Sequence, residues 1–176
     1  MESRNENQTI ANEREVLNSP KRPENRRLVI SPVAIQTARA FIAWTQPAFT
    51  PPADAAFAIG ARTGDGTLLG VALIGWPTAS LFDDGDTAEL LCLATDGMPD
   101  VSPTLLVAAW REVRTMGYRR LIAYTRIYEP GTGLWDAGFR IVPSPLGRGV
   151  GSRSGSPEDG DAVRVLWEIR DAGGRR

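Results

Sequence analysis

The side chains available for chemistry in this 176-residue chain are restricted, because it contains no histidine. This absence excludes Ser-His and Cys-His nucleophile pairs and histidine-ligated metals, and it removes the side chain that titrates closest to neutral pH. The single cysteine, Cys92, excludes an internal disulfide and a multi-cysteine metal site. It lies in an apolar run without a nearby activating base, so we interpret it as a small buried hydrophobe. Acid–base chemistry therefore falls to a carboxylate, a tyrosine, a thiol or solvent, and we expect no bound metal.

The sequence Ser102-Pro103-Thr104 opens a strongly amphipathic segment and predicts the start of a helix. Ser102 is a favoured N-cap residue, and Pro103 fits the first helical position. The free N–H groups and the dipole at a helix start attract anions. Ordinary capping needs no ligand, so these residues are candidates either for a capping turn or for an anion site.

The composition is that of a globular protein of one-domain length, with 42% hydrophobic and 23% charged residues. A net charge of −1 argues against a dedicated nucleic-acid coat. No apolar run approaches the roughly 18 residues of a membrane span, and the polar opening segment lacks a secretion signal. We therefore expect a cytoplasmic protein with no membrane partner. Lys21 is the only lysine, and the excess of arginine is typical of a GC-rich genome or of arginines that grip phosphate or carboxylate.

The chain divides into one predicted domain and two ends. Residues 1–26 are polar and lack apolar periodicity, which predicts a disordered tail. Residues 27–170 form the predicted domain, and residues 171–176 are expected to fray. Residues 144–161 are rich in Gly, Ser, Pro and Arg, which predicts a long loop whose role the sequence leaves open.

Apolar patterning predicts the elements that must position any site. Strands are expected over residues 28–33, 57–62, 68–76, 89–94, 120–125, 139–142 and 162–169, and helices over residues 35–45, 102–116 and 131–137. Asp65-Gly66 predicts a hairpin turn, Gly117 predicts a helix C-cap, and Trp110 and Trp135 are expected in the core. A hairpin followed by a βαβ crossover predicts an α+β fold with a mixed sheet, antiparallel early and partly parallel later, covered by helices.

Two stretches carry a family resemblance: a strand, turn and long helix over residues 90–117, and a short helix that ends at Gly138-Phe139 before a strand. The intervening motifs are Ala94-Thr95-Asp96-Gly97, Ala108-Ala109-Trp110-Arg111, Gly117-Tyr118-Arg119-Arg120-Leu121, Tyr124-Thr125 and Glu129-Pro130-Gly131-Thr132. Together with the element order, they resemble the GNAT superfamily of acyl-CoA-dependent N-acetyltransferases. The motifs are most similar to a small divergent GNAT-like branch met on bacterial mobile elements and in phages.

This resemblance implies a single α/β-type GNAT domain around a twisted mixed sheet of about six or seven strands, with acetyl-CoA as co-substrate. It implies that the pyrophosphate binds at Ser102, Pro103 and Thr104. The pantetheine arm is then expected between two strands, beside Leu93, Ala94 and Thr95 on one of them. The acetyl group would pass directly to an amine acceptor, without an acyl-enzyme.

The resemblance also assigns candidate catalytic residues. In the GNAT arrangement, a bulged strand gives backbone N–H groups to the thioester carbonyl, and a carboxylate on or near that strand acts as the base. Glu89 is the first candidate for this base and Glu129 is the second. The alternative is that both are ordinary surface glutamates without a catalytic role. Tyr124 and Tyr128 are the candidates for the proton donor, although strand tyrosines are also common packing residues.

The sequence departs from the GNAT pattern at two places, and these keep alternatives open. The usual tyrosine acid falls on Leu134, and the phosphate loop retains only Gly97 among its glycines and contains two prolines without N–H. One alternative is a catalytically silent GNAT-fold binding module. The other is a mobile-element DNA-modification or anti-restriction protein, for which a Gly-Ser-Arg loop over residues 147–156 would lie against nucleic acid.

The acceptor is left as an unidentified small molecule or nucleobase. We expect residues 44–53 and 77–86 to build its pocket. Arg140, Arg148 and Arg153 are candidates for the cofactor's 3′-phosphate or for an acidic substrate, although the simpler interpretation is solvated charge. Because many GNAT relatives pair through their late strands, the resemblance also implies a homodimer.

Overall fold

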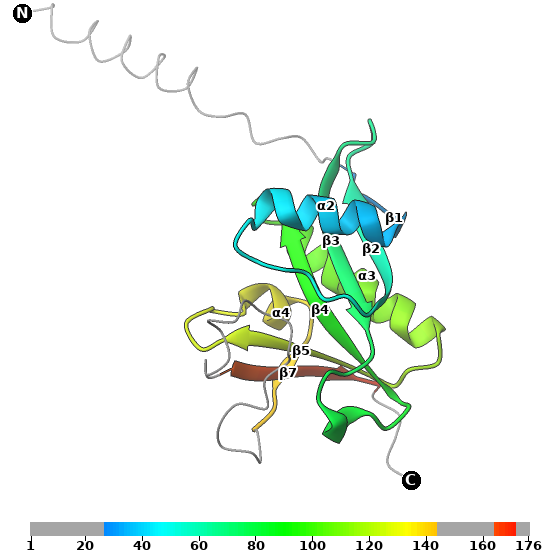
Figure 1. Cartoon of the computed structure of the whole chain (residues 1–176), viewed down its shortest axis with the longest axis vertical. Helices are drawn as coiled ribbons and strands as arrows, with labels where there is room; N and C mark the ends of the chain where they lie inside the picture. The colour runs from blue at the N-terminus through cyan, green and yellow to red at the C-terminus, as the bar shows by residue number, and fades with distance from the viewer. Residues whose placement is uncertain (1–26, 144–163, 172–176) are drawn as a thin grey trace, which may run out of the picture.

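The computed structural model describes residues 27–143 and 164–171, which build one seven-stranded mixed sheet with helices on both faces (Figure 1). The strands are β1 (Val29–Val33), β2 (Ala55–Arg62), β3 (Leu68–Gly75), β4 (Thr87–Thr95), β5 (Arg120–Arg126), β6 (Arg140–Ile141) and β7 (Arg164–Arg170). The helices in this part of the chain are α2 (Ile35–Thr45), α3 (Val101–Thr115), α4 (Thr132–Asp136) and the 3-10 turn η1 (Ser80–Phe82). Among the described residues, no helix is long and apolar enough to cross a membrane.

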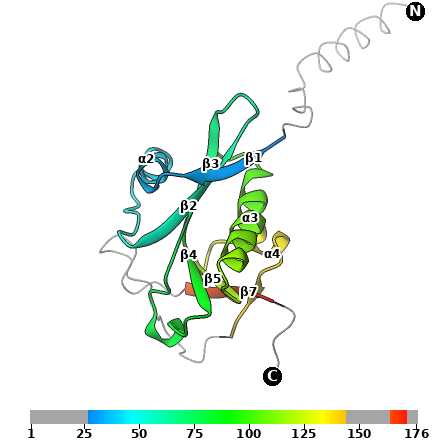
Figure 2. The ribbon, with the colours of Figure 1, turned by 90° about the vertical axis from the view of Figure 1, so that its right-hand side faces the viewer.

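The sheet order is β1-β2-β3-β4-β5-β7-β6, and β4 with β5 forms the parallel pair among otherwise antiparallel neighbours. The mixed sheet that the sequence predicted is therefore confirmed. Figure 2 shows α2 and α3 on opposite faces of the sheet. Each face has its own apolar cluster: Phe41 and Ile42 anchor the cluster under α2, while Leu105 and Leu106 anchor the larger one under α3.

Two predicted glycine positions are confirmed by their backbone angles. Gly66 has φ of 92° in the β2–β3 turn, where Thr63 N–H donates to the Thr67 carbonyl. Gly117 has φ of 96° just after α3, and the next N–H, of Tyr118, returns to the Val113 carbonyl. A left-handed residue at this position ends the helix and satisfies its last carbonyls.

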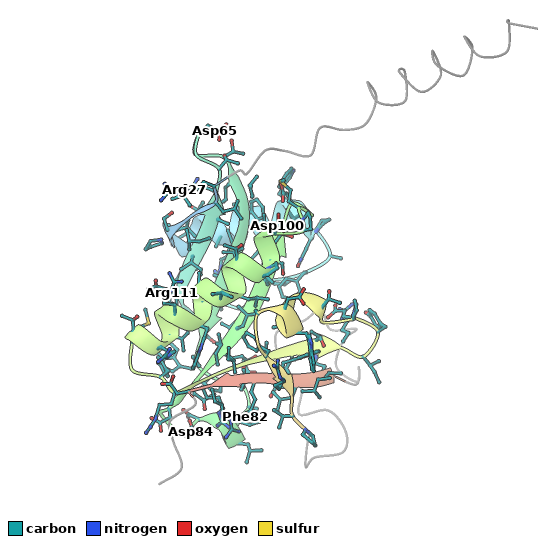
Figure 3. All side chains as sticks on the ribbon, turned by 180° about the vertical axis from the view of Figure 1, so that it is seen from behind. Arg27, Asp65, Phe82, Asp84, Asp100 and Arg111 are labelled. Atoms are coloured by element: carbon teal, nitrogen blue, oxygen red, sulfur yellow. The ribbon has the colours of Figure 1, made fainter. Side chains whose placement is uncertain are left out.

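The loop before β4 fixes the amino ends of the parallel pair. Arg120, at the start of β5, donates from Nε to Thr87 Oγ1 over 2.7 Å and forms an ion pair with Asp84 at 2.6 Å. Its guanidinium also lies 5.1 Å from the ring of Phe82. Phe82 and Asp84 stand together at this edge in Figure 3. The start of β4 and the start of β5 are thus held together, which matters because their other ends separate.

Three expectations about the helices were wrong. Helix α3 begins at Val101 with Asp100 in the N-cap position, so Ser102 is not the cap and Pro103 is not the first helical residue. The reason is that Asp100 itself has helical angles, with φ −84° and ψ −12°, and begins the winding two residues early. Trp135 is 55% exposed rather than in the core, because the short helix α4 buries only Leu134.

The other predicted elements are confirmed within a few residues at each end. The 3-10 turn η1 was not predicted, because residues 81–86 read as a polar connection. The predicted tail over residues 1–26 and the predicted loop over residues 144–161 lie outside the described residues, as do residues 172–176. The predicted domain limits remain predictions.

Candidate active site between β4 and β5

The parallel pair β4–β5 is joined over only part of its length. Residues Thr87 to Leu90 of β4 pair with Arg120 to Ala123 of β5. Beyond this point β4 continues to Thr95 and β5 to Arg126 without pairing to each other. Figure 1 shows the two strands diverging toward their carboxyl ends. Backbone groups of both strands therefore face a gap in the middle of the sheet.

A β-bulge lies in β4 where the separation begins. Leu73 of β3 pairs with Cys92, but its neighbour Ile74 pairs with Leu90, so Leu91 is an extra residue on β4. A bulge bends its strand and re-aims the residues that follow it. The bulged strand that the GNAT resemblance implied is therefore present, next to the expected catalytic segment.

A cavity of about 460 Å³ occupies this opening. It is lined by Gln46, Pro47, Ala48, Phe49, Glu89, Leu90, Leu91, Cys92, Leu93, Tyr124, Thr125, Arg126, Glu129 and Arg164. The walls thus come from the end of α2 and the loop behind it, from β4, from β5 and from the start of β7. Its volume is in the range, roughly 300–1,000 Å³, of sites for small ligands.

Glu89 is a buried carboxylate on the wall of this cavity, with 1% of its surface exposed. Its Oε2 accepts hydrogen bonds from the backbone N–H of Thr78 at 2.7 Å and from the Thr78 hydroxyl at 2.9 Å. Its neighbours Ala88 and Leu90 pack under α3, so the alternation of the strand points Glu89 to the α2 side. A buried acid of this kind requires partners, and Thr78 supplies two of them.

Tyr124 lines the same cavity from β5. Its hydroxyl is buried and has no hydrogen-bond partner in the described part of the chain. Burial raises the pKa of this phenol to about 12, and the negative charge of Glu89 adds to the rise. The hydroxyl therefore keeps its proton over the whole physiological range.

The other two catalytic candidates lie farther out. Glu129 is exposed at the rim of the cavity, and its Oε2 accepts the backbone N–H of Arg126 at 2.9 Å in the turn that follows β5. Tyr128 is 70% exposed and does not line the cavity; its hydroxyl accepts a hydrogen bond from Arg126 Nη1 at 2.7 Å. The structure brings Glu89 and Tyr124 together, with Glu129 at the edge and Tyr128 outside.

The predicted cofactor residues of β4 differ in their surroundings. Leu93 lines the cavity, and its carbonyl accepts a hydrogen bond from Gln46 Nε2 at 3.4 Å. Because the N–H and C=O of one strand residue point to the same side, the Leu93 N–H also faces the gap. Ala94 is buried in the cluster under α2, and the Thr95 hydroxyl accepts the Gly97 N–H at 3.4 Å.

The start of α3 offers fewer donors to an anion than the sequence led us to expect. Within the first turn, Val101 N–H bonds the Met98 carbonyl, Thr104 N–H bonds the Asp100 carbonyl, and Pro103 has no N–H. This leaves the N–H of Ser102. Asp100 lies at this helix start (Figure 3), and a carboxylate at this place would repel an anion such as a phosphate. None of the three predicted pyrophosphate residues lines the cavity.

Leu134 occupies the position of the usual GNAT tyrosine and is buried in the core under α3. Of the segments expected to build the acceptor pocket, residues 46–49 line the cavity, whereas the 77–86 segment acts through Thr78. Arg140 lies 4.7 Å from the Trp135 ring and outside the cavity. Arg148 and Arg153 fall outside the described residues. No group of three or more His, Cys, Asp or Glu side chains that could hold a metal occurs in the described ranges.

Several residues that line the cavity or contact Glu89 were not predicted individually from the sequence. Gln46, Thr78, Arg126 and Arg164 were not singled out, and each reaches the site only through the pairing of distant segments. For the two arginines, only a position could be read from the sequence: Arg126 directly follows the predicted strand over residues 120–125, and Arg164 lies within the predicted strand over residues 162–169. Their juxtaposition depends on the β5–β7 register, which local patterns do not give.

No family model and no curated protein matches the chain. Solved structures do match. YncA of Salmonella typhimurium, solved with its cofactor acetyl-CoA, superposes with a TM-score of 0.60 at 12% identity, covering 85% of this chain and 96% of that chain. The IAA acetyltransferase from Bacillus cereus gives a TM-score of 0.57 at 14% identity, covering 82% and 99%. The GNAT domain of S. lividans PAT gives 0.55 at 17% identity, covering 80% and 89%.

These structural similarities establish the fold of the chain. The chain has the fold of the GNAT acetyltransferases, as the sequence resemblance implied. The bulged β4 and the opening between β4 and β5 lie within that shared fold.

Proposed function

We propose that this protein is an N-acetyltransferase that uses acetyl-CoA and passes the acetyl group directly to an amine. The observation that carries the proposal is the buried Glu89 carboxylate in a cavity opened by the bulge and separation of β4. The acetyl-CoA bound to YncA, which has the same fold, supports the choice of donor. We place the reaction in the bacterial cytoplasm, where the single thiol of Cys92 would stay reduced.

The gap between β4 and β5 suits the pantetheine arm, which carries amide groups along its length. The Leu93 carbonyl already accepts an amide N–H from the gap side, that of Gln46, although the 3.4 Å distance makes this a weak bond. A pantetheine amide would replace Gln46 at this carbonyl. The N–H of Leu93 then supplies a donor for the arm or for the thioester oxygen.

Glu89 is suited to act as the base. The amine nitrogen attacks the thioester carbonyl carbon, the carbon–sulfur bond breaks, and the proton leaving the nitrogen passes to Glu89 directly or through one water. The two hydrogen bonds from Thr78 hold Oε2, which fixes the orientation of the carboxylate. An oriented base lowers the cost of reaching the reactive geometry.

Tyr124 supports the departing sulfur as a hydrogen-bond donor rather than by giving up its proton. The pKa of its phenol is raised to about 12. A thiol has a pKa of about 8.5, well below that of this phenol, so full proton transfer from Tyr124 to the departing sulfur would be uphill. The thiolate therefore leaves with a hydrogen bond from Tyr124 and takes its proton from solvent.

A second candidate is a GNAT-fold binding module without chemistry. The helix start favours it, because Asp100 stands where phosphates would bind and Ser102 supplies the remaining N–H. The burial of Leu134 at the usual tyrosine position favours it as well. The two candidates differ in cofactor binding, because a module that has lost its chemistry has no need of acetyl-CoA.

Calorimetric titration of acetyl-CoA into the wild-type protein and two matched variants tests the proposal. The hydroxyls of Thr104 and Thr115 each donate to the carbonyl four residues earlier, at opposite ends of α3. Thr104→Glu adds a negative charge at the helix start and should weaken acetyl-CoA binding at least fivefold, whereas Thr115→Glu should leave it within twofold. No acetyl-CoA binding by the wild type would overturn the proposal. Salt-dependent binding of duplex DNA in its place would support the DNA-modification alternative.

A further inference from the structure

We infer that Arg120 is a positioning residue for the proposed reaction, because its guanidinium holds both the strand that carries Glu89 and the loop that carries Thr78. This inference rests on the proposed N-acetyltransferase function and adds to it a residue that does not line the cavity. It follows from a closed ring of contacts that begins and ends at Arg120.

The connection between β3 and β4 carries Thr78 and, directly after it, the 3-10 turn η1. In this turn the Phe82 N–H donates to the carbonyl of Ala79, the buried neighbour of Thr78, at 2.9 Å. The Arg120 guanidinium lies 5.1 Å from the Phe82 ring, and its Nη2 donates to Asp84 Oδ2 at 2.6 Å (Figure 3). A guanidinium is attracted to the face of an aromatic ring as well as to a carboxylate. Arg120 therefore holds the connection at two points just beyond Thr78.

The same guanidinium holds β4. Arg120 and Thr87 are register partners on the parallel pair, and Arg120 Nε donates to Thr87 Oγ1 at 2.7 Å. Thr87 is buried and stands two residues before Glu89, so the two side chains lie on the same face of β4. The contacts thus close into a ring. It runs from Arg120 along β4 to Glu89, crosses two hydrogen bonds to Thr78, and returns through η1.

The charge of Arg120 is well compensated where it lies. Its side chain is only 16% exposed, and its Nη1 lies 3.9 Å from a second acid, Glu168 of β7. A largely buried charge requires such partners. Burial raises the pKa of the Tyr124 phenol, and the positive charge of Arg120 acts against that rise, so this charge is felt inside the cavity. A lysine at this position would keep the charge but would lose the planar set of donors that reaches strand and loop at once.

This ring matters for catalysis because a base acts only while its carboxylate is correctly oriented. Both hydrogen bonds from Thr78 converge on Oε2 of Glu89, so movement of the connection would turn the carboxylate away from the amine. Loss of orientation lowers the rate of the chemical step without changing the contacts of the cofactor. We therefore expect Arg120 to affect kcat and to leave the affinity for acetyl-CoA unchanged.

Hydrogen exchange at the Thr78 amide, followed by NMR, tests the ring directly and needs neither cofactor nor acceptor. This amide donates to Glu89, so its protection reports whether the connection stays in place. Arg120→Lys should accelerate exchange at Thr78 at least tenfold. Asp84→Asn is a milder second variant, which removes the ion pair and keeps Arg120, and should accelerate it at least threefold. Amides in the middle of β2 and β3 should exchange within twofold of the wild-type rate in both variants.

Arg114→Lys is the matched control for Arg120→Lys. Arg114 also pairs with an aspartate, Asp171, at 2.8 Å and lies 5.7 Å from an aromatic ring, that of Trp110. Its contacts hold α3, on the other face of the sheet, and not the connection between β3 and β4. Exchange at Thr78 and turnover should both stay within twofold of wild type, and thermal unfolding checks that every variant is folded.

The catalytic consequence is measured as thiol release from acetyl-CoA, with ethanolamine, benzylamine and spermidine as probe amines. Arg120→Lys should lower kcat at least tenfold, while calorimetry shows acetyl-CoA affinity within twofold. Thr78→Val removes the hydroxyl and keeps the backbone N–H, and it should lower kcat at least threefold, whereas Thr78→Ser should restore it. The double variant Arg120→Lys with Thr78→Val should be within twofold of the slower single variant, because both changes act through the same hydrogen bonds.

Three results would overturn the inference and leave the proposed function intact. They are unchanged exchange at Thr78 in both Arg120→Lys and Asp84→Asn, equal acceleration at Thr78 and throughout β2 and β3, and losses of turnover that multiply in the double variant. The second result would mean that Arg120 stabilises the fold as a whole. If the wild type does not bind acetyl-CoA, the proposed function fails, and faster exchange confined to Thr78 would still show that Arg120 holds the pair of Thr78 and Glu89.

Discussion

Replacing Tyr124 with phenylalanine tests whether the Tyr124 hydroxyl acts in the reaction or stabilises the fold. An ordinary buried tyrosine hydroxyl is hydrogen-bonded, and its removal destabilises the protein. The hydroxyl of Tyr124 is buried beside Glu89 and has no partner in the described part of the chain. Tyr124→Phe should therefore make the protein more stable and less active. Removing the hydroxyl of a tyrosine with a purely structural role would instead lower stability and leave activity unchanged.

The size of the stability gain follows from the missing partner. Leaving a buried polar group unsatisfied costs about 1–3 kcal/mol, and the substitution removes that group while keeping the ring in place. Taking the lower end of this range, we expect unfolding to become harder by about 1 kcal/mol. For a chain of this size, that corresponds to an increase in Tm of roughly 2–4 °C. Turnover should fall on the order of 100-fold, because one donor to developing charge is lost.

The assay combines thermal unfolding with the release of thiol from acetyl-CoA. Tyr118→Phe serves as the control, since Tyr118 is half-buried against the core under α3, outside the cavity. It should change neither turnover nor Tm by a comparable amount. A lower Tm for Tyr124→Phe together with unchanged turnover would refute the reasoning, because the hydroxyl would then have a structural partner and no part in the reaction.

Three further predictions concern other positions. Glu89→Gln should lower turnover on the order of 100-fold or more in steady-state assays, with calorimetry showing acetyl-CoA affinity within twofold; unchanged turnover would remove Glu89 from the mechanism. Gly131→Ala should destabilise the fold by about 3 kcal/mol in urea unfolding, because its Cβ would overlap the Trp167 ring and its φ is 62°. Gly66 has a φ of 92° but open space around a Cβ, so Gly66→Ala should lower the free energy of unfolding by only about 1 kcal/mol. Equal losses of stability in the two variants would contradict the idea that the Trp167 ring excludes a Cβ at Gly131. Burial raises the pKa of the Cys92 thiol to about 12, so the thiol should react with disulfide reagents much more slowly in the folded protein than in the unfolded one. The pKa of Cys92 is higher in the folded protein than in the unfolded chain, where it is about 9. The contribution of Cys92 to the free energy of unfolding is therefore complete below pH 9 and should decline as the pH rises toward 12.

The order of elements was predictable because the local signals agree with one another. The Asp65-Gly66 pair, the apolar face of α3 and Gly117 each mark a boundary through the conformational preferences of a few neighbouring residues. Glu89 was a candidate because the resemblance expects a carboxylate on or near a bulged strand, and Tyr124 was a candidate because it could replace the missing tyrosine acid. Their meeting at one cavity depends on the β4–β5 register, which the patterning of neither strand determines.

The start of α3 shows where a local rule fails. Ser102 followed by Pro103 is a strong capping signal, yet Asp100 adopts helical angles and takes the N-cap position. The preceding turn is stabilised by its own bonds: Met98 N–H donates to Asp96, and Val101 N–H donates to the Met98 carbonyl. These two bonds lie on either side of Asp100 and accompany the earlier start of the helix.

Other parts of the site depend on contacts between distant segments. The bulge at Leu91 has no glycine or proline to mark it, because it arises from the pairing of β4 with β3. Thr78 reaches Glu89 from a turn eleven residues earlier, and Arg126 meets Arg164 across two strands. Contacts of this kind are set by the assembled sheet, so a reading of local propensity does not find them.

A crystal structure of the protein with desacetyl-CoA tests the central claim most directly, because it shows where the pantetheine arm lies. We predict the arm between β4 and β5, its sulfur within hydrogen-bond distance of the Tyr124 hydroxyl, and a pantetheine amide in place of Gln46 at the Leu93 carbonyl. An arm bound outside this opening, or crystals at saturating desacetyl-CoA that show none bound, would contradict the account.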